Sequence, residues 1–290
     1  MSKVDEEIGD AKNALATNPW QALRRFTNAR IALGRTGGSL PTAPLLAFNL
    51  SHAQARDAVH QPLDTETLHR ELNDKGFETI GVFSAAPTRE QYLRRPDLGR
   101  RLSDESAAHL AQRTPVSEEP PALVFVIADG LSANAAARHA IPLIERMRAE
   151  LDSWRIGPIV VARQARVAIG DEIGDLLRAE MVVVLIGERP GLSSPDSLGI
   201  YMTYHPVIGR HDAERNCISN VRPEGLTYDA AAFKLTYLLT AARNSGMTGV
   251  GLKDSSVSQS IPPDTRCPER SAALLPQPSK PRMDSKRDKE

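Results

Sequence analysis

Long apolar runs and an excess of one charge are missing from this 290-residue sequence, and cysteine is scarce. Its two cysteines, Cys217 and Cys267, lie too far apart for a CxxC pair and are too few for a disulfide scaffold. No uninterrupted apolar stretch reaches the roughly 18 residues of a membrane span. The first 25 residues contain acids and lack the apolar region of a signal peptide. Together, these absences predict a soluble chain in the reducing cytoplasm.

The charge balance excludes two further classes of protein. Lysine and arginine together number 36, and aspartate and glutamate together number 36, so the formal net charge is zero. A protein that coats nucleic acid or an anionic membrane carries a basic excess. We therefore expect neither partner. The length suffices for one large domain or two modest ones.

The first third of the chain has mainly helical patterns. Asn18 followed by Pro19 is typical of a helix start. Apolar residues then recur at helical spacing, at Trp20, Leu23, Phe26 and Ile31, which predicts a helix with one buried face. Further elements are expected as helices at 42–59 and 65–74, a short strand at 77–83 and a helix from Ser103. The sequence thus predicts a flexible N-terminus at 1–17 and a mainly helical domain at 18–113.

After a linker at 114–122, strand and helix patterns alternate. Strand-like apolar runs lie at 123–128, 158–162, 181–186 and, more weakly, 198–204, and helical patterns begin at Ser132, near 171 and at Tyr228. This alternation predicts an α/β domain with a parallel sheet at 123–254. The segment 255–290 is rich in proline, serine and charge without periodicity, so it is predicted to be a disordered tail.

Three polar segments follow the predicted strands, where ligands of α/β sheets gather. They are 129–132 (DGLS), 187–191 (GERPG) and 215–220 (RNCISN), the last interpreted as a loop. Each combines a carboxylate, hydroxyl, amide or thiol with small or turn-forming residues. The sequence thus predicts a binding face.

Structural interpretations of the same residues remain open. Ser132 can be an N-cap and Asp129 can hold a turn, while Glu188 can form a surface ion pair with Arg189. Cys217 can be a small buried apolar residue. The seven histidines show no HExxH spacing, and the sequence has no P-loop. No self-sufficient catalytic set is evident.

Four segments carry a resemblance to a known family. They are YLRRPDLGRRL (92–102), IADGLS (127–132), LIGERPGLSSPDSLGIY (185–201) and RNCISN (215–220). In this order and spacing they resemble the small (light) subunit of ethanolamine ammonia-lyase. The likeness includes LGRTG (33–37) and runs from about residue 18 to residue 254.

The resemblance implies an enzyme that uses adenosylcobalamin to convert ethanolamine to acetaldehyde and ammonia. It implies a hetero-oligomer in which a large subunit, a TIM barrel, holds the substrate. The small subunit would have a helical part and a Rossmann-like part that closes over the cobalamin. The family's cofactor contacts correspond here to Val167 in ARVAI, Glu188 in GERPG and Cys217 in CISN. Location inside a bacterial microcompartment is compatible with the family.

The chemistry of the ligand suits these residue types. A corrin is an apolar disc rimmed with amides, so Glu188 can accept hydrogen bonds from its rim and Val167 can pack against it. Asp129 and Ser132 are further candidates by position alone. Two alternatives remain: an assembly module without cofactor contacts, and a hydrolase that uses Cys217 with His205 or His211. The corrin loss caused by changing Glu188 separates the first alternative from the cofactor hypothesis.

Overall fold

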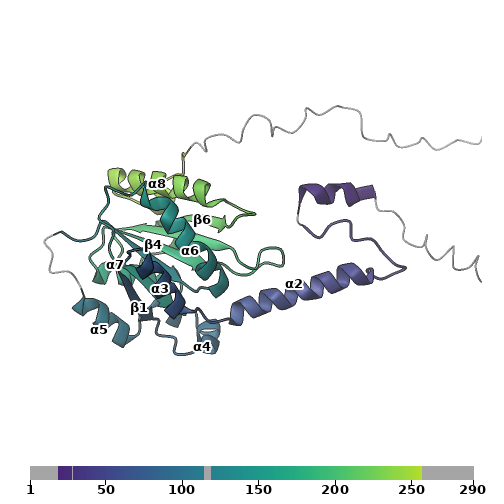
Figure 1. Cartoon of the computed structure of the whole chain (residues 1–290), viewed down its shortest axis with the longest axis horizontal. Coiled ribbons are helices and arrows are strands. Elements are labelled where there is room, and N and C mark those ends of the chain that lie inside the picture. The colour runs from purple at the N-terminus through teal and green to yellow at the C-terminus, as the bar shows by residue number, and fades with distance from the viewer. Residues whose placement is uncertain (1–18, 28, 114–118, 257–290) are drawn as a thin grey trace, which may run out of the picture. The chain divides into compact units, whose positions relative to one another are not determined.

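Six strands form one sheet in the computed structural model, which describes residues 19–27, 29–113 and 119–256 (Figure 1). They are β1 (Thr79–Phe83), β2 (Leu123–Ala128), β3 (Ile159–Arg163), β4 (Met181–Gly187), β5 (Leu198–Tyr204) and β6 (Asn216–Val221). Their order across the sheet is β1-β3-β2-β4-β5-β6. The first four strands pair in parallel, whereas β5 pairs antiparallel with β4 and with β6. The predicted α/β class is confirmed, with a mostly parallel sheet.

The β5–β6 edge of the sheet corrects two expectations. Residues 188–197 join β4 to β5 without a helix, and a parallel crossover needs a dozen or more residues, so β5 must run antiparallel. The segment RNCISN, predicted as a loop, supplies most of β6. Its apolar Ile218 and Val221 face the core, while Cys217 and Ser219 are exposed. Polar residues on the outer face concealed the strand pattern.

Helices cover both faces of the sheet. The α-helices are α2 (Thr42–His60), α3 (Thr65–Asp74), α4 (Arg89–Arg94), α5 (Asp104–Gln112), α6 (Ala133–Arg148), α7 (Ile169–Leu176) and α8 (Tyr228–Ser245), with 3-10 turns at Pro19–Phe26, Leu98–Arg100, Asp212–Glu214 and Gly249–Gly251. One core cluster joins α3, α6 and α8 to one face of the sheet, and a second joins α5 and α7 to the other. β2 is buried along its whole length between these layers, which is why its sequence is continuously apolar.

The layer formed by α5 and α7 leaves part of its face of the sheet open. α7 packs on β4, whereas α8, which packs on β5 and β6, belongs to the opposite layer. On the α7 side, Tyr201 of β5 is half-buried and Cys217 of β6 is exposed. This open β5–β6 face gives the molecule a place where a flat ligand or a partner can contact the sheet directly.

The N-terminal elements differ from expectation in what they bury. Residues 19–26 form a 3-10 helix instead of an α-helix, and the predicted apolar face is exposed, with Trp20 at 65% and Phe26 at 72%. α2 and α3 form as predicted. β1 also forms and pairs with β3, so this strand of the predicted helical region belongs to the common sheet.

Three predicted regions lie wholly or largely outside the described residues: the N-terminus at 1–17, positions 114–118 of the linker, and the tail from 257 onward. Within the described ranges, no helix combines the length and apolar character needed to cross a bilayer.

Candidate functional site

The carboxylate of Asp129, at the end of β2, is occupied by the protein itself. Its oxygens accept hydrogen bonds from the backbone amides of Gln164 at 2.8 Å and Ala165 at 3.0 Å, and from Arg89 Nη1 at 3.1 Å. Burial raises the pKa of Asp129, and Arg89 and the two amides oppose that rise. The side chain is only 4% exposed. Asp129 therefore holds the loop after β3. This contact favours the interpretation of Asp129 as a residue that stabilises a turn over its interpretation as a ligand contact.

Ser132 is the N-cap of α6, as its structural interpretation expected. Its hydroxyl accepts a hydrogen bond from the Ala135 amide at 3.3 Å and donates one to the Pro195 carbonyl at 3.0 Å. The residue is fully buried. Ser132 thus links α6 to the β4–β5 connection and has no surface to offer a ligand.

Two glycines close the crevice between β2 and β4, the usual ligand position in such sheets. A Cβ on Gly130, whose φ is +53°, would lie 2.2 Å from the carbonyl oxygen of Gly187. A Cβ on Gly187 would lie 2.0 Å from the carbonyl oxygen of Ser132. The Leu131 amide also donates to Gly187 at 2.9 Å. Backbone atoms of the two strand ends are therefore closely packed at this crevice.

Glu188, directly after β4, lies over the open β5–β6 face. Its Oε2 accepts hydrogen bonds from Ser197 Oγ at 2.5 Å and from the Asn220 amide at 3.3 Å. A Cβ on Gly199 would lie 3.1 Å from its Oε1, so the carboxylate covers the face to which Gly199 and Tyr201 belong. Within the described residues Oε1 has no hydrogen bond. The predicted segments GERPG and RNCISN are therefore in contact through Glu188 and Asn220.

Cys217 lies beside Tyr201 on the same face. The two residues are cross-strand partners in the pairing of β5 with β6. Burial, and next the neighbouring Cys217, raise the pKa of the Tyr201 hydroxyl, so that hydroxyl stays neutral. Cys217 Sγ also lies 3.3 Å from Ser219 Oγ. In the part of the chain that the structure describes, neither His205 nor His211 is hydrogen-bonded to this thiol, so the hydrolase alternative gains no geometric support.

Val167 approaches the same face from the start of α7. It is half-buried and packs against the core cluster that Tyr201 also contacts. Val167 and Glu188 thus lie in two different connecting segments, and Cys217 lies in β6. All three residues nevertheless lie on one side of the sheet. Tyr201 and Ser197 were missed. The sequence signal for Tyr201 is the alternation of Leu198, Ile200 and Met202, which all face the core. Gly199 and Tyr201 must then lie on the opposite face of β5.

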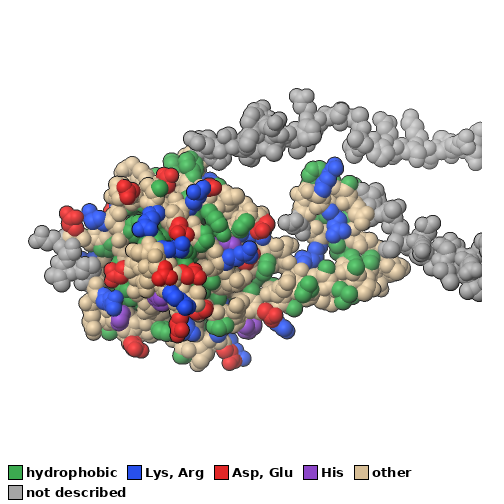
Figure 2. All heavy atoms as spheres, viewed as in Figure 1, with side chains coloured by type: hydrophobic (Ala, Val, Ile, Leu, Met, Phe, Trp, Pro, Cys, Tyr) green, Lys and Arg blue, Asp and Glu red, His purple; other side chains and the backbone are tan. Residues whose placement is uncertain are grey.

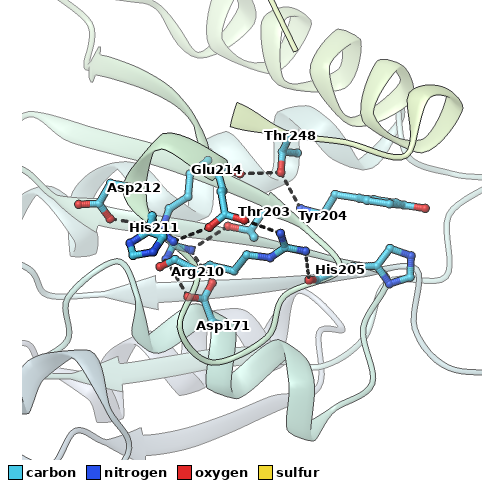
Figure 3. Close-up of polar contacts among 10 residues, drawn as sticks. Asp171, Thr203, Tyr204, His205, Arg210, His211, Asp212, Glu214 and Thr248 are labelled. Carbon is cyan, nitrogen blue, oxygen red and sulfur yellow. Dashed lines mark hydrogen bonds and ion pairs between the residues drawn. The ribbon is translucent and has the colours of Figure 1, made fainter. Parts of the chain in front are cut away.

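A polar network fixes the connection between β5 and β6 (Figure 3). Arg215 forms a bidentate ion pair with Asp171 of α7, and both side chains are only 2% exposed. Arg215 also donates to Thr203 Oγ1 at 3.0 Å and to the Arg210 carbonyl at 2.9 Å. Burial raises the pKa of Asp171, and the hydrogen bonds from Arg215 oppose that rise. The network anchors the start of β6, and therefore Cys217, to α7.

A metal ion would find no ready protein site in the described ranges. No group of three or more histidine, cysteine, aspartate or glutamate side chains is arranged there to hold one.

Comparisons with known proteins agree on one family. The family described as "Ethanolamine ammonia-lyase light chain (EutC)" matches residues 17–253. The ethanolamine ammonia-lyase small subunit of Pseudomonas fluorescens (strain Pf0-1) is 53% identical over 263 residues, which cover 90% of this chain and 96% of that protein. The small subunit from Ralstonia nicotianae is 54% identical over 257 residues, covering 87% and 94%. The chain therefore belongs to the ethanolamine ammonia-lyase light-chain family.

Proposed function

We propose that this chain is the small subunit of an adenosylcobalamin-dependent ethanolamine ammonia-lyase. Its open β5–β6 face would bind the cofactor where it meets a large, TIM-barrel subunit that carries the substrate. The observation that carries this proposal is that Val167, Glu188 and Cys217 lie on the same side of the sheet. We also propose that the α/β part is Rossmann-like and that the helical N-terminal part forms a separate domain.

The residues on this face fit a corrin. Oε1 of Glu188 is an acceptor without an internal partner in the described residues, which suits a primary amide on the corrin rim. Val167, together with the ring of Tyr201, offers apolar surface. Cys217 offers a small thiol that is a weak hydrogen-bonding group. These side chains would bind and orient the ligand and keep water from it.

A cleft of about 330 Å³ lies beside the first turn of α7. It begins at Ala168, next to Val167, and is lined by both cations and carboxylates, among them Arg100, Glu172 and Arg210. Amide side chains both donate and accept hydrogen bonds, so a lining of mixed charge suits them.

The chemistry that the cofactor supplies when bound is homolysis of its cobalt–carbon bond, which starts the radical deamination of ethanolamine. At the open face the Glu188 carboxylate is held by Ser197 and Asn220, and no described histidine is hydrogen-bonded to the Cys217 thiol. The chain's own contribution is therefore binding, orientation and exclusion of water.

Reconstitution tests the proposal. The chain co-expressed with a large subunit should form acetaldehyde from ethanolamine when adenosylcobalamin is added. The isolated chain should show no turnover and should bind the cofactor weakly, because half of the corrin site is absent. Turnover by the isolated chain, or an inactive complex of two folded subunits, would contradict the assignment.

A further inference from the structure

We propose that Ser197 is a positioning residue that holds one oxygen of Glu188 and leaves the other for the ligand. This inference rests on the proposed function, because it assigns Glu188 to the cofactor face. It adds a residue that lies in the resembling segment 185–201 but is not among the cofactor contacts that the resemblance implies. Ser197 is 5% exposed, so its role is to act through its neighbour.

Ser197 contacts Glu188 through both main chain and side chain. The Glu188 amide donates to the Ser197 carbonyl at 2.9 Å, while Ser197 Oγ donates to Glu188 Oε2 at 2.5 Å. The Asn220 amide donates to the same oxygen at 3.3 Å. Two donors on Oε2 restrict the rotation of the carboxylate, and Oε1 has no hydrogen bond within the described residues.

Gly199 provides the space that this arrangement requires. A Cβ at this position would lie 3.1 Å from Glu188 Oε1, 3.2 Å from its Cγ and 3.2 Å from Tyr201 Cε2. Such distances are shorter than ordinary van der Waals contact. The absence of a side chain therefore lets the carboxylate lie against β5 instead of projecting into solvent.

The segment before Ser197 is itself held in place. Ser132 Oγ donates to the Pro195 carbonyl at 3.0 Å, and Arg138 Nη1 pairs with Asp196 at 2.7 Å. Both donors belong to α6 or its N-cap. The segment that carries Ser197 is thus anchored to α6, a helix of the opposite layer. A carboxylate held by such an anchored segment loses little conformational freedom when a ligand binds.

A double-mutant cycle in the reconstituted complex tests the proposal. Ser197→Ala should weaken apparent adenosylcobalamin affinity by about tenfold, as expected when a hydrogen bond to a charged group is lost. In a Glu188→Ala background the same change should have no further effect. Ser197→Thr, which keeps the hydroxyl, should retain more affinity than Ser197→Ala. Ser194→Ala, in the same connection, is the matched control.

The readouts are corrin absorbance retained per complex after gel filtration and affinity from activity titration, with thermal melting to verify folding. Equal loss from Ser197→Ala with and without Glu188 would overturn the positioning role. Normal binding in Ser197→Ala, with weakened binding in Glu188→Ala, would also overturn it and leave the proposed function intact. Normal binding in both variants would instead show that the Glu188 carboxylate does not contact the cofactor.

A second inference rests on a different observation, the exposed apolar surface of residues 19–60, here called the basic apolar arm. Only Ala58 of the 19-residue α2 is buried. Large apolar side chains of the arm are exposed by 40–72%, namely Trp20, Leu23, Phe26, Leu40, Leu45, Leu46, Phe48 and Leu50 (Figure 2). Most of the stability of a helix in a protein comes from packing of its apolar face, and large exposed apolar patches mark interaction sites, so this surface points to a partner.

The distribution of these side chains around α2 defines the shape of the partner. At about 100° per residue, Phe48, Leu45, Leu46 and Leu50 span roughly 200° of the helix circumference. A flat membrane surface buries a narrower stripe. An apolar span this wide fits a groove that encloses the helix, as between elements of a folded protein.

The charge of the arm defines the partner's chemistry. Residues 19–60 contain five arginines, Arg24, Arg25, Arg30, Arg35 and Arg56, and a single acid, Asp57. Two identical arms would repel each other, which disfavours docking between copies of this chain. Arg24 and Arg30 line a groove with Leu33 and Pro44, and Arg30 also donates to the Leu192 carbonyl at 3.3 Å. Leu192 belongs, like Glu188, to the connection between β4 and β5.

We infer that the basic apolar arm docks in an acidic, apolar groove of the large subunit; this rests on the proposed function for the identity of the partner. The pair of changes Leu46→Glu and Leu50→Glu should weaken subunit association by about tenfold or more, since buried apolar anchors dominate interfaces. Gln54→Glu, an exposed position of α2, controls for added charge. Association is measured by sedimentation of mixed full-length subunits.

Three results would overturn this docking site. The first is unchanged association in the double variant. The second is self-association of the wild-type chain that the double variant abolishes while subunit pairing persists. The third is arm-dependent binding to vesicles of phosphatidylcholine and phosphatidylglycerol with subunit pairing unaffected. Failure of the wild-type chain to pair with a large subunit would instead count against the proposed function.

Discussion

Replacing Asp171 with alanine is expected to lower the free energy of unfolding by about 3–5 kcal/mol, the usual result of breaking a buried ion pair. The change leaves the Arg215 guanidinium 2% exposed without its bidentate partner. Oxygens of Thr203 and Arg210 still accept from some of its donors, and the only carboxylate left near its charge in the described residues is the exposed Asp212. Urea unfolding of the purified chain measures the effect.

Asp212 gives a matched control for this prediction. It also pairs with Arg215, at 3.5 Å, but its side chain is 79% exposed. Asp212→Ala should therefore change stability by less than about 1 kcal/mol, as for surface pairs. Combining Asp171→Leu with Arg215→Met removes both charges and should recover at least half of the loss. Equal effects of Asp171→Ala and Asp212→Ala would show that burial of the pair is not what matters.

The sequence predicted those parts of the fold that local pattern determines. The continuous apolar run 123–128 became β2 with the predicted bounds, and Ser132 became the N-cap of α6. Both follow from chemistry within a few residues: an apolar strand needs cover on both faces, and a helix start needs an acceptor for its free amides. β6 was missed because only its inward positions are apolar.

Contacts between distant segments could not be predicted in the same way. Asp129 is 35 and 36 residues from the amides that it binds, so its burial was not evident from the strand-end motif. Ser197 and Glu188 lie close in sequence, but their contact depends on β5 turning back along β4. Val167, Glu188 and Cys217 were predicted by resemblance, and their side chains lie on one face only once α7, β4 and β6 are in place.

The second large effect is expected at Glu188. Glu188→Ala should weaken adenosylcobalamin binding by about 10- to 100-fold, because a hydrogen bond to a charged group contributes roughly 1.5–3 kcal/mol. Glu188→Gln should be milder. Ser197 and the Asn220 amide both donate to one position, so the glutamine oxygen must occupy it. The amide nitrogen then faces the ligand, where it can donate to an amide oxygen of the corrin rim but carries no charge.

Apparent affinity is measured by activity titration of the reconstituted complex, and gel filtration verifies that the two subunits remain together. Arg189→Ala is the control, since its exposed side chain is next in sequence and, in its structural interpretation, would pair with Glu188. If Arg189→Ala and Glu188→Ala had equal, small effects on affinity with assembly intact, Glu188 would be interpreted as a residue of a surface turn that does not contact the cofactor. A loss confined to Glu188→Ala would favour the cofactor hypothesis over the assembly-module alternative. In that alternative this chain makes no contact with the cofactor, so removal of the acceptor oxygen should leave cofactor affinity unchanged.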